Sequence, residues 1–155
     1  MKGGFNSSFI EIRTLEGDKF IRDLKVGDIV LSTLGYSKVK GIFQRTARFD
    51  EKVFNIYYHS KDREGVLDRI SGDQVILAKR QGEKYLVDTQ VKDLKSGQIL
   101  WSKEGDVVID QIERMETVNR FFYNIDIDGG CFYADNICIK SIRSVSYTHL
   151  TLPTT

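Results

Sequence analysis

The sequence predicts an all-β domain made of two related halves, and three observations support this. Short runs of alternating apolar and polar residues, separated by glycine turns, have the period of two expected for half-buried strands. No segment keeps the 3.6-residue period of a long amphipathic helix. Residues 22–32 are similar to residues 92–102, 70 positions later and without a gap. Similarity at one fixed offset is typical of a duplicated unit.

Strand-like runs follow one another along most of the chain. We expect strands at residues 9–14, 19–21, 29–32, 37–45, 53–59, 67–70, 75–78, 85–87, 98–101, 106–115, 120–127, 131–133 and 137–139. Phe-Asn-Ile at 54–56 and Tyr-Asn-Ile at 123–125 form a second similar pair, at an offset of 69. Gly41 interrupts one of the longer runs and predicts a β-bulge there.

Composition limits the classes of function. The 155 residues include 23 basic and 22 acidic side chains, a net charge of +1, so we expect no nucleic-acid or anionic-membrane surface. No apolar run approaches the ~20 residues of a membrane-spanning helix. No signal peptide follows Met1, so a cytoplasmic location is the default expectation. Two cysteines are too few for a disulfide scaffold or a zinc site, and we expect no metal or cofactor.

The length suits a single domain with a hydrophobic core. We expect this domain over residues 1–143, with halves near 5–74 and 75–142. Residues 144–155 lie outside the repeat, and their last ten residues resemble a tail that read-through into sequencing adapter adds to unrelated environmental sequences. We expect this tail to be non-native, which removes His149 from the candidate catalytic groups.

Four blocks of this sequence resemble those of Hint domains, the fold shared by inteins and hedgehog autoprocessing domains. They are residues 10–32, with the Asp-Leu-Lys-Val-Gly-Asp turn, residues 67–77, which resemble the block usually written Thr-x-Asp-His, and the closing blocks 123–128 and 132–139. The second Leu-Lys-x-Gly turn, at 94–97, looks like a feature of hedgehog-type members. The resemblance covers about residues 5–141 and implies an all-β Hint fold with pseudo-two-fold halves.

The resemblance also implies a chemistry, self-cleavage by an N-to-S or N-to-O acyl shift. That step needs a thiol or hydroxyl at the first position of the domain. Counting back from Glu16-Gly17 places this position at Phe5, or at Gly4 with a shift of one residue. Neither residue can act as a nucleophile. Ser7 and Ser8 are the nearest hydroxyls, but they come two or more positions too late and are expected to be ordinary turn or strand-start serines.

Two further positions of the family pattern are also changed. The resemblance implies a histidine that protonates the leaving nitrogen, and Gln74 stands in its place, although an amide does not titrate near neutral pH. Ser71 replaces the usual threonine as a hydrogen-bonding partner. Inteins end in His-Asn, whose Asn cyclises, whereas Lys140-Ser141 stand here. The sequence therefore departs from the pattern at three separate places.

The remaining reactive side chains have ordinary structural interpretations. His59 is expected to be an exposed or hydrogen-bonded strand residue rather than a relocated acid–base group. Cys131 and Cys138 would face each other across a two-residue hairpin turn that pairs Tyr133 with Asn136. We expect two buried free thiols, with a cross-strand disulfide as the less favoured alternative.

Three functional hypotheses remain. The first is a degenerate Hint-type domain that cannot cleave itself and serves as a structural or interaction module of a larger polypeptide. The second is an active autoprocessing domain with an altered or truncated nucleophile. The third is an unrelated β-barrel binding module. The three departures favour the first hypothesis, for which we expect a monomer whose partners are the flanking segments of its own polypeptide.

Overall fold

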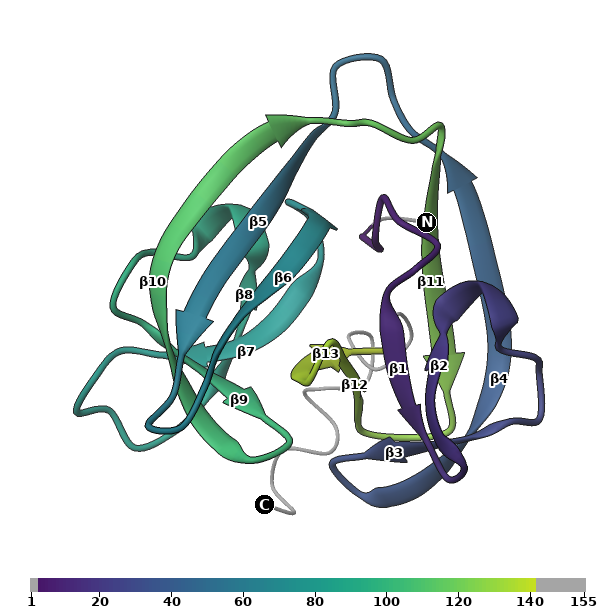
Figure 1. The fold of residues 1–155 in the computed structure, drawn as a ribbon, viewed down its shortest axis with the longest axis horizontal. Helices are drawn as coiled ribbons and strands as arrows, with labels where there is room; N and C mark the ends of the chain where they lie inside the picture. Colours follow the sequence, from purple (N-terminus) through teal and green to yellow (C-terminus); the bar gives the residue numbers. More distant parts are fainter. Residues whose placement is uncertain (1–2, 142–155) are drawn as a thin grey trace.

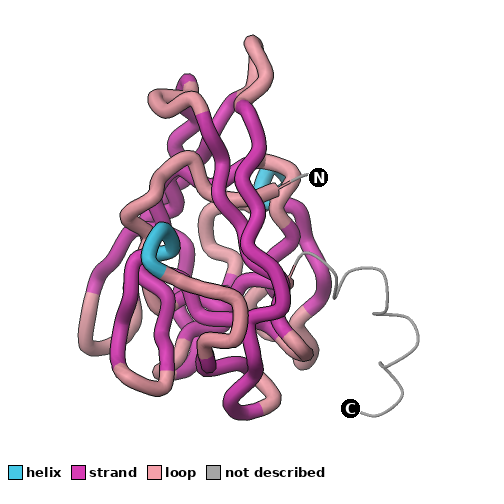
Figure 2. Tube along the Cα trace, turned by 90° about the vertical axis from the view of Figure 1, so that its right-hand side faces the viewer, coloured by secondary structure: helices cyan, strands magenta, loops and turns pink. Residues whose placement is uncertain are grey.

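The computed structural model describes residues 3–141, and its regular secondary structure is almost entirely β-strand (Figure 1). The strands are β1 (Glu11–Thr14), β2 (Gly17–Phe20), β3 (Ile29–Ser32), β4 (Gly35–Thr46), β5 (Lys52–His59), β6 (Glu64–Ser71), β7 (Val75–Lys79), β8 (Val87–Gln90), β9 (Ile99–Ser102), β10 (Gly105–Glu116), β11 (Phe121–Ile127), β12 (Cys131–Ala134) and β13 (Ile137–Lys140). Two single-turn 3₁₀ helices, η1 (Ile21–Asp23) and η2 (Val91–Asp93), are visible in Figure 2. The predicted tail lies outside the described residues.

The strands form one curled antiparallel sheet. Its order is β11-β4-β3-β1-β12-β13-β7-β9-β10-β5-β6, with β2 paired to β1 and β8 to β7. In Figure 1 the pair β5 and β10 forms one arm and the pair β4 and β11 forms the other, while β12 and β13 lie between them. The N-terminal segment bridges the two ends of this order, because Phe5 pairs with both β11 and β6.

One run of elements recurs 70 residues later. The bounds of β2, η1, β3 and β4 become those of β8, η2, β9 and β10 when 70 is added to each residue number. The central turn is built alike in both runs, because the Lys25 amide donates to Asp28 Oδ2 at 2.9 Å and the Lys95 amide donates to Gln98 Oε1 at 2.7 Å. A side-chain oxygen accepts this bond in both turns, so Asp in one run and Gln in the other can fill the same role.

The two long strands of the repeated runs cross to the other half of the chain. Strand β4 pairs with β11 over Thr46 to Val39, and β10 pairs with β5 over Glu116 to Val108. The register of β4 shifts by one residue at Lys40, next to Gly41, which is the bulge that the sequence predicts. The expected boundary between residues 74 and 75 is therefore crossed by extensive strand pairing.

The core fills the space enclosed by the curled sheet. Its largest fully buried side chains include Phe5, Phe122 and Phe132, together with isoleucines and leucines of β1, β5, β6, β7, β9 and β10. Alternating burial in β1, β3, β7 and β9 agrees with the predicted period of two. Among residues 3–141, no helix is long and apolar enough to cross a membrane.

The last hairpin corrects the expected pairing of the cysteines. Its two-residue turn is formed by Asp135 and Asn136, whose φ angles are +45° and +77°, as in the type I′ turns preferred by hairpins. This turn places Cys131 opposite Lys140 and Cys138 opposite Tyr133. The thiols are diagonal rather than direct neighbours, and both are free and buried, as expected for the thiol state.

Candidate functional site

The candidate site forms where the N-terminal segment passes between the two ends of the sheet. Phe5 makes β-bridges to Tyr123 of β11 and to Ile70 of β6. On the β11 side, the amide and carbonyl of Phe5 exchange hydrogen bonds of 2.8 Å each with Tyr123. On the β6 side, the Gly4 carbonyl accepts from the Ser71 amide at 2.9 Å. The segment is therefore held on both sides by backbone hydrogen bonds.

Gln74 lies at the centre of the site and is 4% exposed. Its Oε1 accepts from the Gly4 amide at 2.8 Å and from Asn124 Nδ2 at 3.2 Å. Its Nε2 donates to the carbonyls of Val75, at 3.0 Å, and Lys140, at 3.1 Å. Both hydrogens and both lone pairs of this amide are thus used. The two carbonyl acceptors fix the side chain so that its oxygen, not its nitrogen, faces the Gly3–Gly4 peptide.

The other end of the Gly3–Gly4 peptide is held by Arg45, at the end of β4. The Gly3 carbonyl accepts from Arg45 Nη2 at 3.1 Å and from Nε at 3.3 Å. The guanidinium also lies over the Phe122 ring, 4.2 Å from its centroid, and makes two hydrogen bonds, of 2.6 and 2.9 Å, to the carboxylate of Glu51. Two partners besides Gly3 therefore fix Arg45 in place.

Glu51 is a buried carboxylate that anchors this arrangement. Burial on its own would raise the pKa of Glu51. Hydrogen bonds from the Arg45 side chain and the Arg48 amide, and the positive charges of both arginines, outweigh burial and hold the pKa below its ordinary value. Glu51 is therefore ionised at neutral pH and balances the charge of Arg45.

Ser71 provides a hydroxyl at the edge of this network. Its Oγ lies 3.4 Å from Glu51 Oε2 and 3.5 Å from Arg45 Nη2, and it accepts from the Asp73 amide at 3.3 Å. Ser71 thus shares the guanidinium that holds the Gly3 carbonyl.

The two residues at the end of the closing block have different roles. Lys140 contributes its backbone carbonyl to Gln74, while its ammonium group pairs with Asp88 at 3.0 Å. The Ser141 hydroxyl donates to Asp126 Oδ1 at 3.1 Å and accepts from the Ile127 amide at 3.1 Å. The structure thus brings Gly4, Ser71, Gln74 and the Lys140 backbone together, and it ties Ser141 to β11.

The remaining candidates lie outside this cluster. His59 is exposed at the end of β5 and pairs through Nδ1 with Asp110 at 2.6 Å. The Ser7 hydroxyl accepts from the Phe9 amide at 3.2 Å, as in an ordinary turn. Among the described residues, the hydrogen bonds of these two side chains go to Asp110 and Phe9 and not to the Gly3–Gly4 peptide.

Sequence reasoning did not find Arg45, Glu51 or Asn124. Asn124 lies within the similar pair 54–56 and 123–125, so its position was visible but its role was not. No local pattern singles out Arg45 or Glu51, since a charged residue near a strand end is usually solvated. Their role depends on the fold, which brings the end of β4 to the N-terminal segment.

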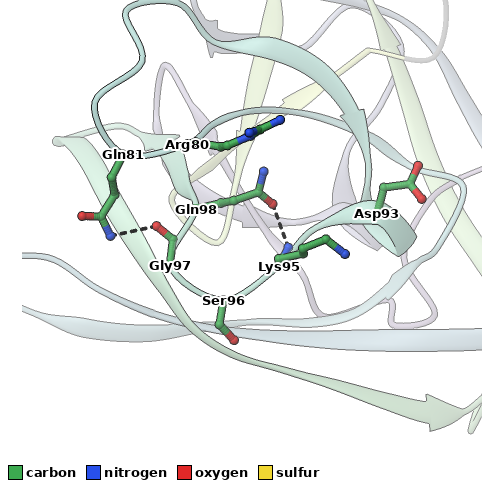
Figure 3. Close-up of a pocket in the computed structure, with 7 residues that line it drawn as sticks. All are labelled: Arg80, Gln81, Asp93, Lys95, Ser96, Gly97 and Gln98. Atoms are coloured by element: carbon green, nitrogen blue, oxygen red, sulfur yellow. Dashed lines mark hydrogen bonds between the residues drawn. The ribbon is translucent and has the colours of Figure 1, made fainter.

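Two surface hollows differ in their relation to the site. One of about 530 Å³ is lined in part by Glu51 and Ser71, together with Arg48, Lys92 and Arg114. Another of about 660 Å³ lies over the second repeated turn and is lined by Arg80, Gln81, Asp93, Lys95, Ser96, Gly97 and Gln98 (Figure 3). Of these two hollows, the first borders the candidate site and the second does not.

Solved inteins have the same fold. The chain is similar to the gp41-1 intein, with 24% identity, 91% of this chain and 100% of that chain covered, and a TM-score of 0.69. It is also similar to a bacterial intein-like domain from Clostridium thermocellum, with 18% identity, 91% of this chain and 99% of that chain covered, and a TM-score of 0.70. A third similar structure is an intein from a hyperthermophile, with 14% identity, 90% of this chain and 100% of that chain covered, and a TM-score of 0.72. No protein-family model and no curated protein sequence matches the chain.

The protein therefore has the Hint fold. In architecture it is an intein-like domain, which argues against an unrelated β-barrel that only shares a turn pattern. At these identities the likeness establishes the fold alone, so the activity has to be argued from the site.

Proposed function

We propose that this chain is a degenerate Hint-type domain that does not cleave itself and serves as a structural or interaction module of a larger polypeptide. The observation that carries the proposal is the orientation of Gln74. Cleavage of the Gly3–Gly4 peptide requires a proton on the Gly4 nitrogen as that nitrogen leaves. Gln74 instead accepts a hydrogen bond from this nitrogen, and both of its own N–H groups are bound elsewhere.

The glycine at position 4 supports the same proposal, because it carries no nucleophile. Gly4 has a φ of +97°, and a Cβ atom built there would lie 2.7 Å from the Tyr123 carbonyl oxygen. Real Cβ atoms essentially never come so close to another heavy atom, so the backbone would have to move. Position 4 is therefore adapted to glycine, and a simple change to cysteine or serine does not fit this conformation.

Active autoprocessing is the second candidate, and one observation favours it. The Gly3 carbonyl oxygen accepts two hydrogen bonds from a guanidinium, an arrangement that would stabilise negative charge during acyl transfer. In that case the Ser71 hydroxyl, which shares this guanidinium, is the candidate nucleophile, and Glu51 is the group that would accept its proton. The two candidates differ in whether the peptide is ever broken.

The test uses the full chain with a reporter protein fused ahead of Met1. After incubation with dithiothreitol, hydroxylamine or cholesterol, intact-mass measurement is expected to find only the uncut fusion. Cleavage at Gly3–Gly4 in any of these conditions contradicts the proposal. A Ser71→Ala fusion then identifies the source, because it stops cleavage only if the Ser71 hydroxyl is the nucleophile.

A further inference from the structure

The connection between β7 and β8 is longer than its counterpart in the first half of the chain. Residues 15–16 join β1 to β2, whereas residues 80–86 join β7 to β8. The longer connection folds back on itself, because the Arg80 amide donates to Glu83 Oε1 at 2.8 Å and the Glu83 amide donates to the Arg80 carbonyl at 3.1 Å. The second half therefore carries an added loop with an internal turn of its own.

This loop rests on the second repeated turn and leaves a groove beside it. Gln81 Nε2 donates to the Gly97 carbonyl at 2.9 Å (Figure 3). The hollow of about 660 Å³ over the turn adjoins another of about 480 Å³, because Arg80 and Gln98 line both. We call these two hollows together the loop groove. The loop groove thus lies where the added loop meets the second copy of the turn.

Hydrogen-bond donors predominate in the loop groove. Gln98 Oε1 accepts from the Lys95 amide, and Figure 3 shows the nitrogen of the same carboxamide on its other side, toward Arg80. Within residues 3–141, no acceptor is found for this nitrogen, and no carboxylate pairs with the Arg80 guanidinium or the Lys95 ammonium group. All three groups donate hydrogen bonds and accept none. A ligand that supplies acceptor oxygens would satisfy them together.

The charge of the loop groove is also positive. The whole chain has a net charge of +1, whereas the groove is lined by more basic than acidic side chains. In Figure 3 the Asp93 carboxylate lies apart from Arg80 and Gln98. The excess of basic groups favours an anionic ligand. The charged lining residues are Lys79, which pairs with Asp106 at 3.9 Å, Arg80, Lys84 and Lys95, and the acids Glu83 and Asp93.

The first copy of the turn lacks two of these donors. Asp28 holds the Lys25 amide there, whereas Gln98 holds the equivalent amide in the second copy and adds an N–H₂ group. Val26 stands where the second copy has Ser96, whose hydroxyl is a further donor at the edge of the groove. The donor-rich character therefore belongs to the second copy and is not required by the turn itself.

We propose that the loop groove binds an organic phosphate, a phosphate monoester of a small apolar or aromatic group. A phosphate monoester presents three terminal oxygens, which match the three separate donors of Arg80, Lys95 and Gln98 better than the two oxygens of a carboxylate do. The inference goes beyond the proposed function, because it assigns a ligand class to a surface that does not border the Gly3–Gly4 peptide.

The adjoining hollow accounts for the organic part of the ligand. It is lined by Tyr85 and Val87, which are 75% and 57% exposed. Two large apolar side chains beside a cluster of donors are typical of sites that bind one polar and one apolar group of the same molecule. The phosphate would lie over the turn, and the apolar group would lie against Tyr85 and Val87.

The first experiment titrates the full chain with phenyl phosphate, inorganic phosphate and phenol, each at millimolar concentration, and follows backbone amide shifts by NMR. At about pH 7.5 both phosphates are largely dianionic. We expect phenyl phosphate to shift the amides of residues 81–85 and 95–98 and to bind more tightly than either other probe, since each of these offers only one part of the ligand. Equal binding of inorganic phosphate overturns the proposal. So does an absence of shifts in these two ranges, or larger shifts at Glu51 and Ser71, which line a different hollow.

The second experiment uses the duplication as its control. Lys95→Gln removes one cation of the loop groove, and Lys25→Gln removes the equivalent exposed lysine of the first turn. We expect Lys95→Gln to weaken phenyl phosphate about fivefold, the size expected from the loss of one exposed charge contact, and Lys25→Gln to leave binding unchanged. Gln98→Asp restores the residue type of the first turn and should weaken binding at least as much, because it removes a donor and adds a like charge. Equal losses in both lysine variants would mean attraction to overall charge and would overturn the site.

Discussion

Gln74 shows how one side chain can keep the geometry of a reactive site while changing its chemistry. Its carboxamide bonds to the Gly4 amide on one side and to the Lys140 carbonyl on the other. It thereby joins the N-terminal segment, the block at 67–77 and the last strand. A histidine could exchange a proton at this place, whereas an amide cannot.

Truncating Gln74 tests its structural weight. Gln74→Ala leaves the buried Gly4 amide and Asn124 side chain without their acceptor, and a buried unsatisfied group costs about 1–3 kcal/mol. We expect the free energy of unfolding to fall by at least that amount in urea denaturation. Gln81→Ala is the matched control, since Gln81 is exposed and donates to the Gly97 carbonyl at the surface. Equal losses in both variants would show that the buried network is not important for stability.

Asp135 gives a pH-dependent prediction. Burial, only partly offset by a hydrogen bond from the Glu11 amide, and the nearby charges of Glu11, Asp68 and Asp18 raise its pKa from 3.8 to about 6. A raised pKa means that the folded state favours the protonated acid, so this contribution to stability is full below pH 3.8 and is lost as pH rises through about 6. Asp135→Asn should therefore raise the melting temperature at about pH 7.5 and change it much less at about pH 3.5.

The asparagine variant keeps the backbone conformation that this position requires. Asn tolerates the φ of +45° at residue 135 at least as well as Asp, and its carbonyl oxygen can still accept from the Glu11 amide. A melting-temperature gain that is the same at both pH values would mean that the carboxylate charge is not the cause.

For individual residues, the sequence predicted the site positions that the family pattern marks and missed those that only the fold brings together. Ser71 and Gln74 could be identified because each sits at a fixed place in a block, and counting back from Glu16-Gly17 gave Phe5, or Gly4 with a shift of one residue. Arg45 comes from a strand end 42 residues away from Gly3 in the chain, and no local pattern indicates such a contact. The predicted pairing of Cys131 with Cys138 was wrong for a related reason, because residue types alone did not show which two residues form the hairpin turn.

At the scale of an element, the two copies of the repeated Leu-Lys-x-Gly turn are expected to respond alike to the same substitution. Gly27 and Gly97 have φ angles of +98° and +88°, and a Cβ at either would meet no heavy atom closer than 3.9 Å. Replacing either glycine by alanine should therefore cost only backbone strain, about 1–2 kcal/mol. We expect Gly27→Ala and Gly97→Ala to have equal effects on urea denaturation, within error. A clearly larger effect at one turn would contradict their structural equivalence.

Strand positions could be predicted where the apolar alternation was strong. Strand β3 is found at Ile29–Ser32, as predicted, and β11 begins one residue later than predicted. Strand β8 was expected at 85–87 but lies at Val87–Gln90. Its last three residues are polar and pair with β7, so there was little apolar burial for the sequence pattern to reveal.

At the scale of the whole molecule, the crossing of the long strands joins the two halves. Strand β4 lies in the first half but pairs with β11 of the second, and β10 lies in the second half but pairs with β5 of the first. The offset of 70 residues indicates related halves, but it does not show that they exchange strands. That exchange is a long-range property, because the same local sequences could also pair within each half.

The exchange predicts that neither half is stable alone. A fragment of residues 1–74 keeps β4 and β5 but loses their partners β11 and β10. A fragment of residues 75–155 keeps β10 and β11 but loses their partners β5 and β4. Each would expose two long strand edges and half of a shared core, which small chains cannot compensate. We expect each fragment to lack a cooperative thermal transition by circular dichroism.

An equimolar mixture of the two fragments should regain such a transition, because the missing partners are then supplied between chains. Its midpoint should rise with concentration, as mass action requires for an assembled species, whereas that of the intact chain should not. A cooperative transition in either isolated fragment would contradict the prediction and would mean that strands pair within a half when the other half is absent. In that case the strand crossing of the intact chain would be a consequence of its connectivity rather than a requirement of the fold.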